Sequence, residues 1–99
     1  MKCFTIDTSP DGKRYFCHMS DICMETYFKN TDIKTTWNIL FARIFNLEYA
    51  DFLRMVRDLY GATLAGKTGG YIYFYFEDKS MCQKFINELE RKFDLWKKS

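Results

Sequence analysis

The chain has 99 residues, and 15 lysines and arginines against 13 aspartates and glutamates leave a formal charge of +2 at pH 7. This near balance argues against a protein that binds through phosphate contacts alone, because such proteins usually carry a strong basic excess. The sequence contains no apolar run of the roughly eighteen residues that a membrane-spanning helix needs, so we expect none. The length predicts a single domain, residues 1–99.

Aromatic residues are abundant, with 10 Phe, 7 Tyr and 2 Trp. A core this small cannot bury every ring, so some rings are expected at an interface. The sequence has no nucleophile elbow and no ordered Ser–His–Asp set. We therefore predict a protein that is not an enzyme and uses no cofactor.

The N-terminal segment predicts a cytoplasmic protein. Asp7 interrupts it too early for the apolar region of a signal peptide. In that compartment, cysteines are expected to be reduced thiols that behave as small hydrophobic residues. The four cysteines are Cys3, Cys17, Cys23 and Cys82.

The first two strands are predicted at residues 2–8 and 13–19. A Ser-Pro-Asp-Gly turn joins them, in which proline presets φ and glycine closes the fourth position. Pairing about this turn places Phe4 opposite Cys17 on an apolar face. The other face of this hairpin then carries Cys3, Thr5, Phe16 and His18.

Residues 20–30 are ambiguous. Ser20 or Asp21 suits the N-cap of a short helix, whereas the Thr-Tyr-Phe run at 26–28 also suits a strand. We favour one or two turns of helix.

Two clearer helices follow, at residues 35–45 and 47–60. Asn46 is expected to end the first helix and to cap the second, and Gly61 to end the second in a left-handed C-cap. The N-cap of the first helix is expected at Thr31, Asp32 or Thr35. The expected buried faces are Trp37, Leu40, Phe41 and Ile44 in the first helix, and Tyr49, Phe52, Leu53, Val56, Leu59 and Tyr60 in the second.

The strongest strand signal is Gly-Tyr-Ile-Tyr-Phe-Tyr-Phe at residues 70–76, preceded by a short strand at 62–66 and a turn. Strict alternation divides its side chains between two faces. Ile72, Phe74 and Phe76 are expected to face the core, and Tyr71, Tyr73 and Tyr75 the other side. A last helix, capped by Asp78 or Ser80, should bury Phe85, Ile86, Leu89, Phe93 and Trp96.

These elements predict an α+β fold. Two antiparallel β-hairpins would form a roughly four-stranded sheet, with about three helices packed on one face. Tyr71, Tyr73 and Tyr75, which we call the tyrosine row, would then lie on the opposite face.

Residues 61–68, Gly-Ala-Thr-Leu-Ala-Gly-Lys-Thr, match the P-loop pattern in letters. A functional P-loop lies between a strand and a helix whose N-terminus stabilises the phosphates. Here a helical segment precedes the motif and a strand-forming run follows it. We therefore interpret both glycines as C-cap and turn residues, and do not predict a nucleotide site.

A metal site at Cys3, His18 and Cys23 is an alternative, because cysteine and histidine are zinc ligands. The sequence lacks the two closely spaced ligand pairs that structural zinc sites usually show, so we predict no metal site. His18 has no evident nucleophile or orienting acid beside it, so it is not predicted to be catalytic.

The tyrosine row allows three interpretations. In the first, a helix covers the three rings and they belong to the core. In the second, the bases of a single-stranded nucleic acid stack on the rings. In the third, the rings bind another protein. We favour the third interpretation, a small protein-binding module such as a phage-type inhibitor or adaptor that acts on a host protein or defence complex. The predicted contact residues are Tyr71, Tyr73, Tyr75, Phe16 and His18. A single-stranded nucleic acid is the alternative partner, and a second copy of the chain could also occupy this face.

Overall fold

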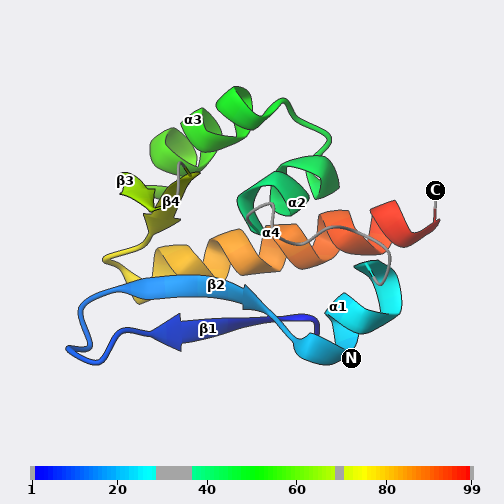
Figure 1. Ribbon diagram of the computed structural model, residues 1–99, viewed down its shortest axis with the longest axis horizontal. Helices are drawn as coiled ribbons and strands as arrows, with labels where there is room; N and C mark the ends of the chain where they lie inside the picture. Colours follow the sequence, from blue (N-terminus) through cyan, green and yellow to red (C-terminus); the bar gives the residue numbers. More distant parts are fainter. Residues whose placement is uncertain (1, 29–36, 69–70, 99) are drawn as a thin grey trace.

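A computed structural model describes residues 2–28, 37–68 and 71–98 of the chain, with residues 37, 66–68 and 71–72 described by their backbone only. It has an α+β fold, as predicted. Its radius of gyration of 13.0 Å is that of one compact domain of this length. In chain order (Figure 1), the elements are β1 (Phe4–Thr8), β2 (Tyr15–Met19), α1 (Asp21–Phe28), α2 (Trp37–Ile44), α3 (Tyr49–Tyr60), β3 (Thr63–Thr68), β4 (Tyr71–Tyr75) and α4 (Lys79–Lys98).

The first hairpin has a different register from the predicted one. Phe4 pairs with Met19, and Ile6 pairs with Cys17, so β2 is shifted by two residues. The reason is a longer loop: the Ser9 N–H donates to the Arg14 carbonyl at 2.9 Å, outside the tight Ser-Pro-Asp-Gly turn. A shift of two residues preserves the alternation of faces, so the predicted apolar face survives.

The second hairpin pairs β3 with β4, with an irregularity between Ala65 and Lys67. Phe74 and Phe76 are buried, which confirms that these two rings face the core. The side chain of Ile72, expected beside them, lies outside the described part of the chain.

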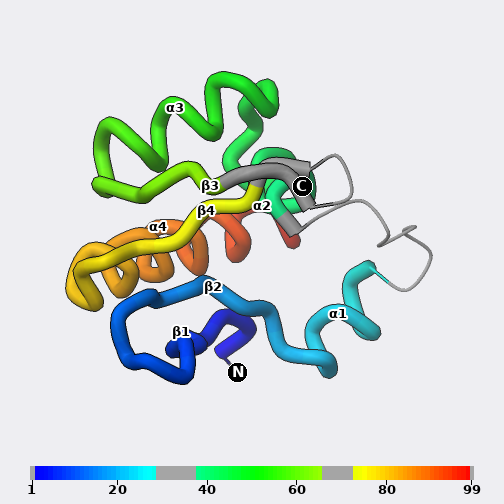
Figure 2. The backbone as a smooth tube through the Cα atoms, turned by 60° about the vertical axis from the view of Figure 1, so that its left-hand side comes forward, coloured from blue at the N-terminus to red at the C-terminus, as the bar shows by residue number. Residues whose placement is uncertain are grey.

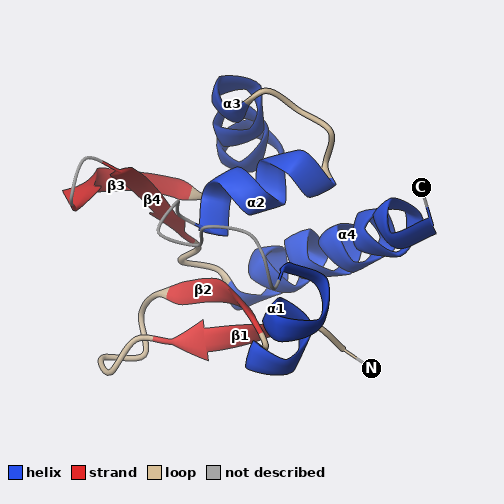
Figure 3. Cartoon of the chain, turned by 45° about the vertical axis from the view of Figure 1, so that its right-hand side comes forward, coloured by secondary structure: helices blue, strands red, loops and turns tan. Residues whose placement is uncertain are grey.

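The two hairpins do not form one four-stranded sheet, which corrects the prediction. They are separate two-stranded sheets, joined among the described residues by one antiparallel bridge between Tyr15 and Phe76 with two backbone hydrogen bonds of 2.8 Å. Figure 3 shows them diverging beyond this point. Strands β1 and β2 contact α4, and β3 contacts α3. Phe74 and Phe76, at the end of the second hairpin, also pack on Phe85 of α4.

Helix α4 lies between the first hairpin and the pair α2 and α3, as Figure 2 shows. Phe85 of α4 is fully buried at the centre of the core. Its neighbours are aromatic rings with centroids 5.5 to 6.4 Å away, contributed by Phe41, Phe45, Phe52, Tyr60, Phe74 and Phe76. The burial of Phe85, Ile86, Leu89 and Phe93 confirms the predicted core face of α4, whereas Trp96, also expected to be buried, is half-buried against the core.

Several helix ends follow the expected capping chemistry. Ser20 Oγ accepts a hydrogen bond from the Cys23 N–H at 3.3 Å, and Asp78 Oδ1 accepts one from the Ser80 N–H at 2.9 Å. Gly61 ends α3 with φ 68°, in the left-handed region. The predictions of α1 as a helix and of these caps are confirmed.

Two expectations about the central helices differ. Asn46 ends α2 with φ 57°, as predicted, but Glu48 occupies the N-cap of α3 and makes no side-chain cap hydrogen bond. Leu59 is 68% exposed and does not belong to the buried stripe. The caps expected at residues 31–35 lie outside the described residues.

The longest helix, α4, has 20 residues and carries charges along its length. No helix in residues 2–28, 37–68 and 71–98 has the length and apolar character required to cross a membrane.

Candidate functional site

The two described tyrosines of β4 lie on the face opposite the core. Strand alternation directs Phe74 inward onto Phe52 of α3, at a centroid distance of 5.9 Å, and so directs Tyr73 and Tyr75 outward. Tyr73 is 39% exposed, and Tyr75 is half-buried. The side chain of Tyr71, the third member of the predicted row, lies outside the described residues.

The bridge between the hairpins brings β2 beside Tyr75. Because Tyr15 bonds to Phe76, their neighbours Phe16 and Tyr75 come together on the outer side, with ring centroids 6.0 Å apart and planes tilted by 54°. The sequence predicted this proximity on the condition that the hairpins are neighbours. One bridge is sufficient to meet that condition.

Arg14 adds a cation to these rings. Its guanidinium carbon lies 4.7 Å from the centre of the Tyr75 ring, within the range of a cation–π interaction. The sequence did not indicate a role for Arg14, because the second strand predicted at residues 13–19 included it rather than leaving it in the loop. We call Arg14, Phe16, Tyr73 and Tyr75 the outer aromatic face.

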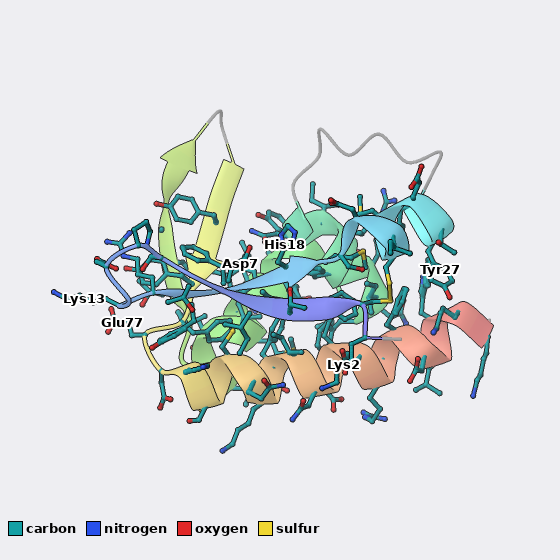
Figure 4. All side chains as sticks on the ribbon, turned by 90° about the horizontal axis from the view of Figure 1, so that it is seen from below. Lys2, Asp7, Lys13, His18, Tyr27 and Glu77 are labelled. Carbon is teal, nitrogen blue, oxygen red and sulfur yellow. A yellow bond between two sulfur atoms is a disulfide. The ribbon has the colours of Figure 1, made fainter. Side chains whose placement is uncertain are left out.

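His18 lies on the same side of β2 as Phe16. Its Nδ1 is 3.6 Å from Oδ2 of Asp7, and both side chains are well exposed. Figure 4 shows Asp7 and His18 together on the first hairpin. The structure therefore places His18 beside an acid, at the margin of the outer aromatic face.

An open cleft of about 630 Å³ lies next to Tyr75. Charged residues from both sides of the bridge line it, and two of them, Lys13 and Glu77, are labelled in Figure 4. Hydrogen bonds from the Ser9 hydroxyl and the Lys13 N–H hold the pKa of Asp11 below its ordinary value, so this carboxylate stays ionised at neutral pH. The lining residues are Asp11, Lys13, Arg14, Tyr75 and Glu77.

Cys3 and Cys23 form a disulfide with a Cα–Cα distance of 5.6 Å, so the prediction that all four cysteines are reduced is wrong for this pair. The Ser20 N–H donates to the Cys3 carbonyl at 2.8 Å, which brings the start of α1 beside the start of β1. Cys17 and Cys82 are free thiols.

The disulfide also removes two of the three ligands considered for zinc at Cys3, His18 and Cys23. No group of three or more His, Cys, Asp or Glu side chains suited to a metal ion occurs within residues 2–28, 37–68 and 71–98.

The P-loop letters do not form a phosphate-binding loop. Gly61 is the C-cap of α3, and Thr63–Thr68 is strand β3, paired antiparallel with β4. A P-loop needs a helix N-terminus directly after its lysine, whereas this segment continues along a strand to Thr68. Comparison of the chain with protein-family models, curated proteins and solved structures found no match.

Proposed function

We propose that this protein is not an enzyme and binds another protein through the outer aromatic face, with His18 at its margin and Tyr71 as a further contact residue predicted from the sequence. One observation carries the proposal: Tyr73, Tyr75 and Phe16 lie outside the core, although Phe74 on β4 and Met19 on β2 are buried. Tyrosine and arginine are enriched at protein interfaces, because they offer a large contact area and hydrogen bonds with few torsions to freeze.

The form of the surface supports a role as an inhibitor or adaptor. Two rings and one guanidinium are already in contact before any partner arrives, so little ordering is needed on binding. The adjacent cleft carries two cations and two anions, which favours a partner of mixed charge over a uniformly acidic one. The cytoplasm is the proposed compartment, where the buried thiol of Cys82 stays reduced.

The proposal is tested by affinity capture from source cells with three versions of the protein. Tyr75→Ala is expected to weaken the affinity for a specific partner by about tenfold or more, as truncation of an interface tyrosine commonly does. Ile22→Ala is the matched control, because Ile22 is 64% exposed on α1, and it should retain the partner. Circular dichroism confirms that both variants are folded. Equal capture by all three versions would contradict the proposal.

A second candidate function is the binding of single-stranded nucleic acid, favoured by the position of Arg14 over Tyr75 with Lys13 nearby. Titration of a fluorescein-labelled oligothymidine separates the two functions. Affinity for the oligonucleotide that falls steeply with salt supports this alternative, and the absence of binding at low salt removes it. Analytical ultracentrifugation of the parent and Tyr73→Ala tests whether a second copy of the chain occupies the face.

A further inference from the structure

Helix α1 is attached to the domain at two points. At its N-terminal half, the Cys3–Cys23 disulfide joins it to the residue before β1. At its C-terminal half, the rings of Tyr27 and Phe28 pack on Phe93 and Trp96 of α4, with centroids 5.1 to 6.2 Å apart. Figure 4 shows the sulfur–sulfur bond beside the end of α4.

Both cysteines are buried, Cys23 at 0% and Cys3 at 4% exposed. Of the two, Cys3 lines a small cavity of about 60 Å³ beside α4. Glu90, Phe93, Asp94 and Lys97 line the same cavity. A thiolate that enters this cavity therefore meets Cys3 first, beside the ammonium of Lys97, which is paired with Asp94 at 3.1 Å.

The cavity also contains an unusual polar atom. Oε1 of Glu90 is buried, and the structure gives it no hydrogen-bond partner. A disulfide sulfur has no hydrogen to donate, whereas a thiol has one. Reduction of Cys3 would thus supply a donor in a cavity where this acceptor is unpaired.

We propose that the Cys3–Cys23 disulfide is a thiol-exchange site that locks and releases α1, with a small thiol such as glutathione as its reductant. The thiolate attacks the sulfur of Cys3, a new sulfur–sulfur bond forms, and the Cys3–Cys23 bond breaks. The electron pair goes to the sulfur of Cys23, which takes a proton from solvent. A second thiolate then attacks the mixed disulfide, releases Cys3 as a thiol after protonation, and leaves as oxidised glutathione.

The other two cysteines do not compete in this exchange. Cys82 is fully buried, and burial raises the pKa of its thiol to about 11. Burial raises the pKa of the Cys17 thiol as well, with the neighbouring Cys82 as a further cause. Neither supplies an appreciable thiolate at neutral pH. A disulfide of this kind is also the type expected in the cytoplasm, where such bonds are usually transient and redox-sensing.

The test begins with the oxidised full-length protein. Alkylation with iodoacetamide in denaturant, followed by mass spectrometry, should modify Cys17 and Cys82 and leave Cys3 and Cys23 unmodified. A limiting amount of glutathione should then give a mixed disulfide that peptide mapping locates on Cys3. Lys97→Gln should slow this step severalfold, and Lys98→Gln is the matched control. Four alkylated cysteines in the untreated protein, or an adduct on Cys23, would overturn the proposal.

Hydrogen exchange measures the release of α1. Reduction should speed amide exchange in residues 21–28 by on the order of tenfold, while residues 85–89 of α4 stay protected. The double variant Cys3→Ser/Cys23→Ser should reproduce the reduced pattern without any thiol reagent. Unchanged exchange in α1, or an equal rise in α4, would overturn the proposal, because the bond would then either hold nothing or stabilise the whole domain.

Discussion

The guanidinium of Arg14 lies over the ring of Tyr75, 4.7 Å from its centre, and joins the loop of the first hairpin to the last strand of the second. Cation–π pairs at exposed sites contribute about 0.5 to 1 kcal/mol. We expect Arg14→Gln to lower the free energy of unfolding by no more than this amount, measured by urea denaturation. Its larger effect should be on partner binding, where Arg14→Lys should restore only part of the loss, because an ammonium cannot stack as a planar guanidinium does. If Arg14→Gln binds the partner as tightly as the parent does, Arg14 is not part of the outer aromatic face.

Phe85 is the residue on which the core depends most. Its ring is completely buried among six other aromatic side chains. Phe85→Ala should reduce the free energy of unfolding by about 3 to 5 kcal/mol, the range for deletion of a buried ring. Leu59→Ala is the control, because Leu59 is 68% exposed, and it should change stability by less than about 0.5 kcal/mol. Comparable losses from both variants would contradict the packing described for α3 and α4.

Gly61 tests the structural interpretation of the P-loop letters. Its φ of 68° is strained for a residue with a side chain, although a Cβ built there meets nothing within 4 Å. Gly61→Ala should therefore lower the free energy of unfolding by about 1 kcal/mol through backbone strain alone.

Lys67→Ala should leave ATP binding unchanged, since we expect none in the parent. Isothermal titration calorimetry checks the second expectation, and measurable ATP binding that depends on Lys67 would contradict it.

The N-cap of α4 predicts a pH dependence. Hydrogen bonds from the Ser80 hydroxyl and its N–H lower the pKa of Asp78 from its ordinary value of 3.8. A carboxyl group with a lowered pKa in the folded state stabilises the protein above the unfolded-state pKa, and this contribution is lost as the pH falls through the folded-state pKa. Asp78→Ala should thus lower the thermal midpoint at pH 7.

The difference between the parent and Asp78→Ala should narrow below about pH 3.8. Asp78→Asn is the control, since an asparagine caps a helix without charge, and its midpoint should vary less with pH. The thermal midpoints of the parent and of Asp78→Ala would then be compared from about pH 7 to about pH 2.5, a range that spans the titration of a carboxyl group. A constant difference between the two midpoints would show that ionisation of Asp78 plays no part.

Local sequence signals predicted most elements and their faces. The alternation of apolar and polar residues identified the inward side of both hairpins, and a two-residue error in the first register did not change that side. The helix caps at Ser20, Gly61 and Asp78 could also be predicted, because each depends on the chemistry of one side chain or on one φ angle.

Features that depend on distant contacts could not be predicted in this way. The backbone pairing described between the hairpins is one bridge, at Tyr15 and Phe76, which the local pattern of either strand does not reveal. The bond between Cys3 and Cys23 requires two Cα atoms at a suitable distance, which spacing along the chain does not reveal. Arg14 joined the outer aromatic face only through the longer loop.

Site-specific photocrosslinking tests the outer aromatic face most directly. Tyr73, which is 39% exposed, would be replaced by p-benzoylphenylalanine in source cells, and Leu59 of α3 by the same residue as the control. A defined crosslinked band from position 73, absent at position 59 and lost when Tyr75→Ala is added, is the result that we predict. Identical crosslinking from the two positions, or none from position 73 in cells that contain the folded protein, would contradict the claim that this face binds a protein.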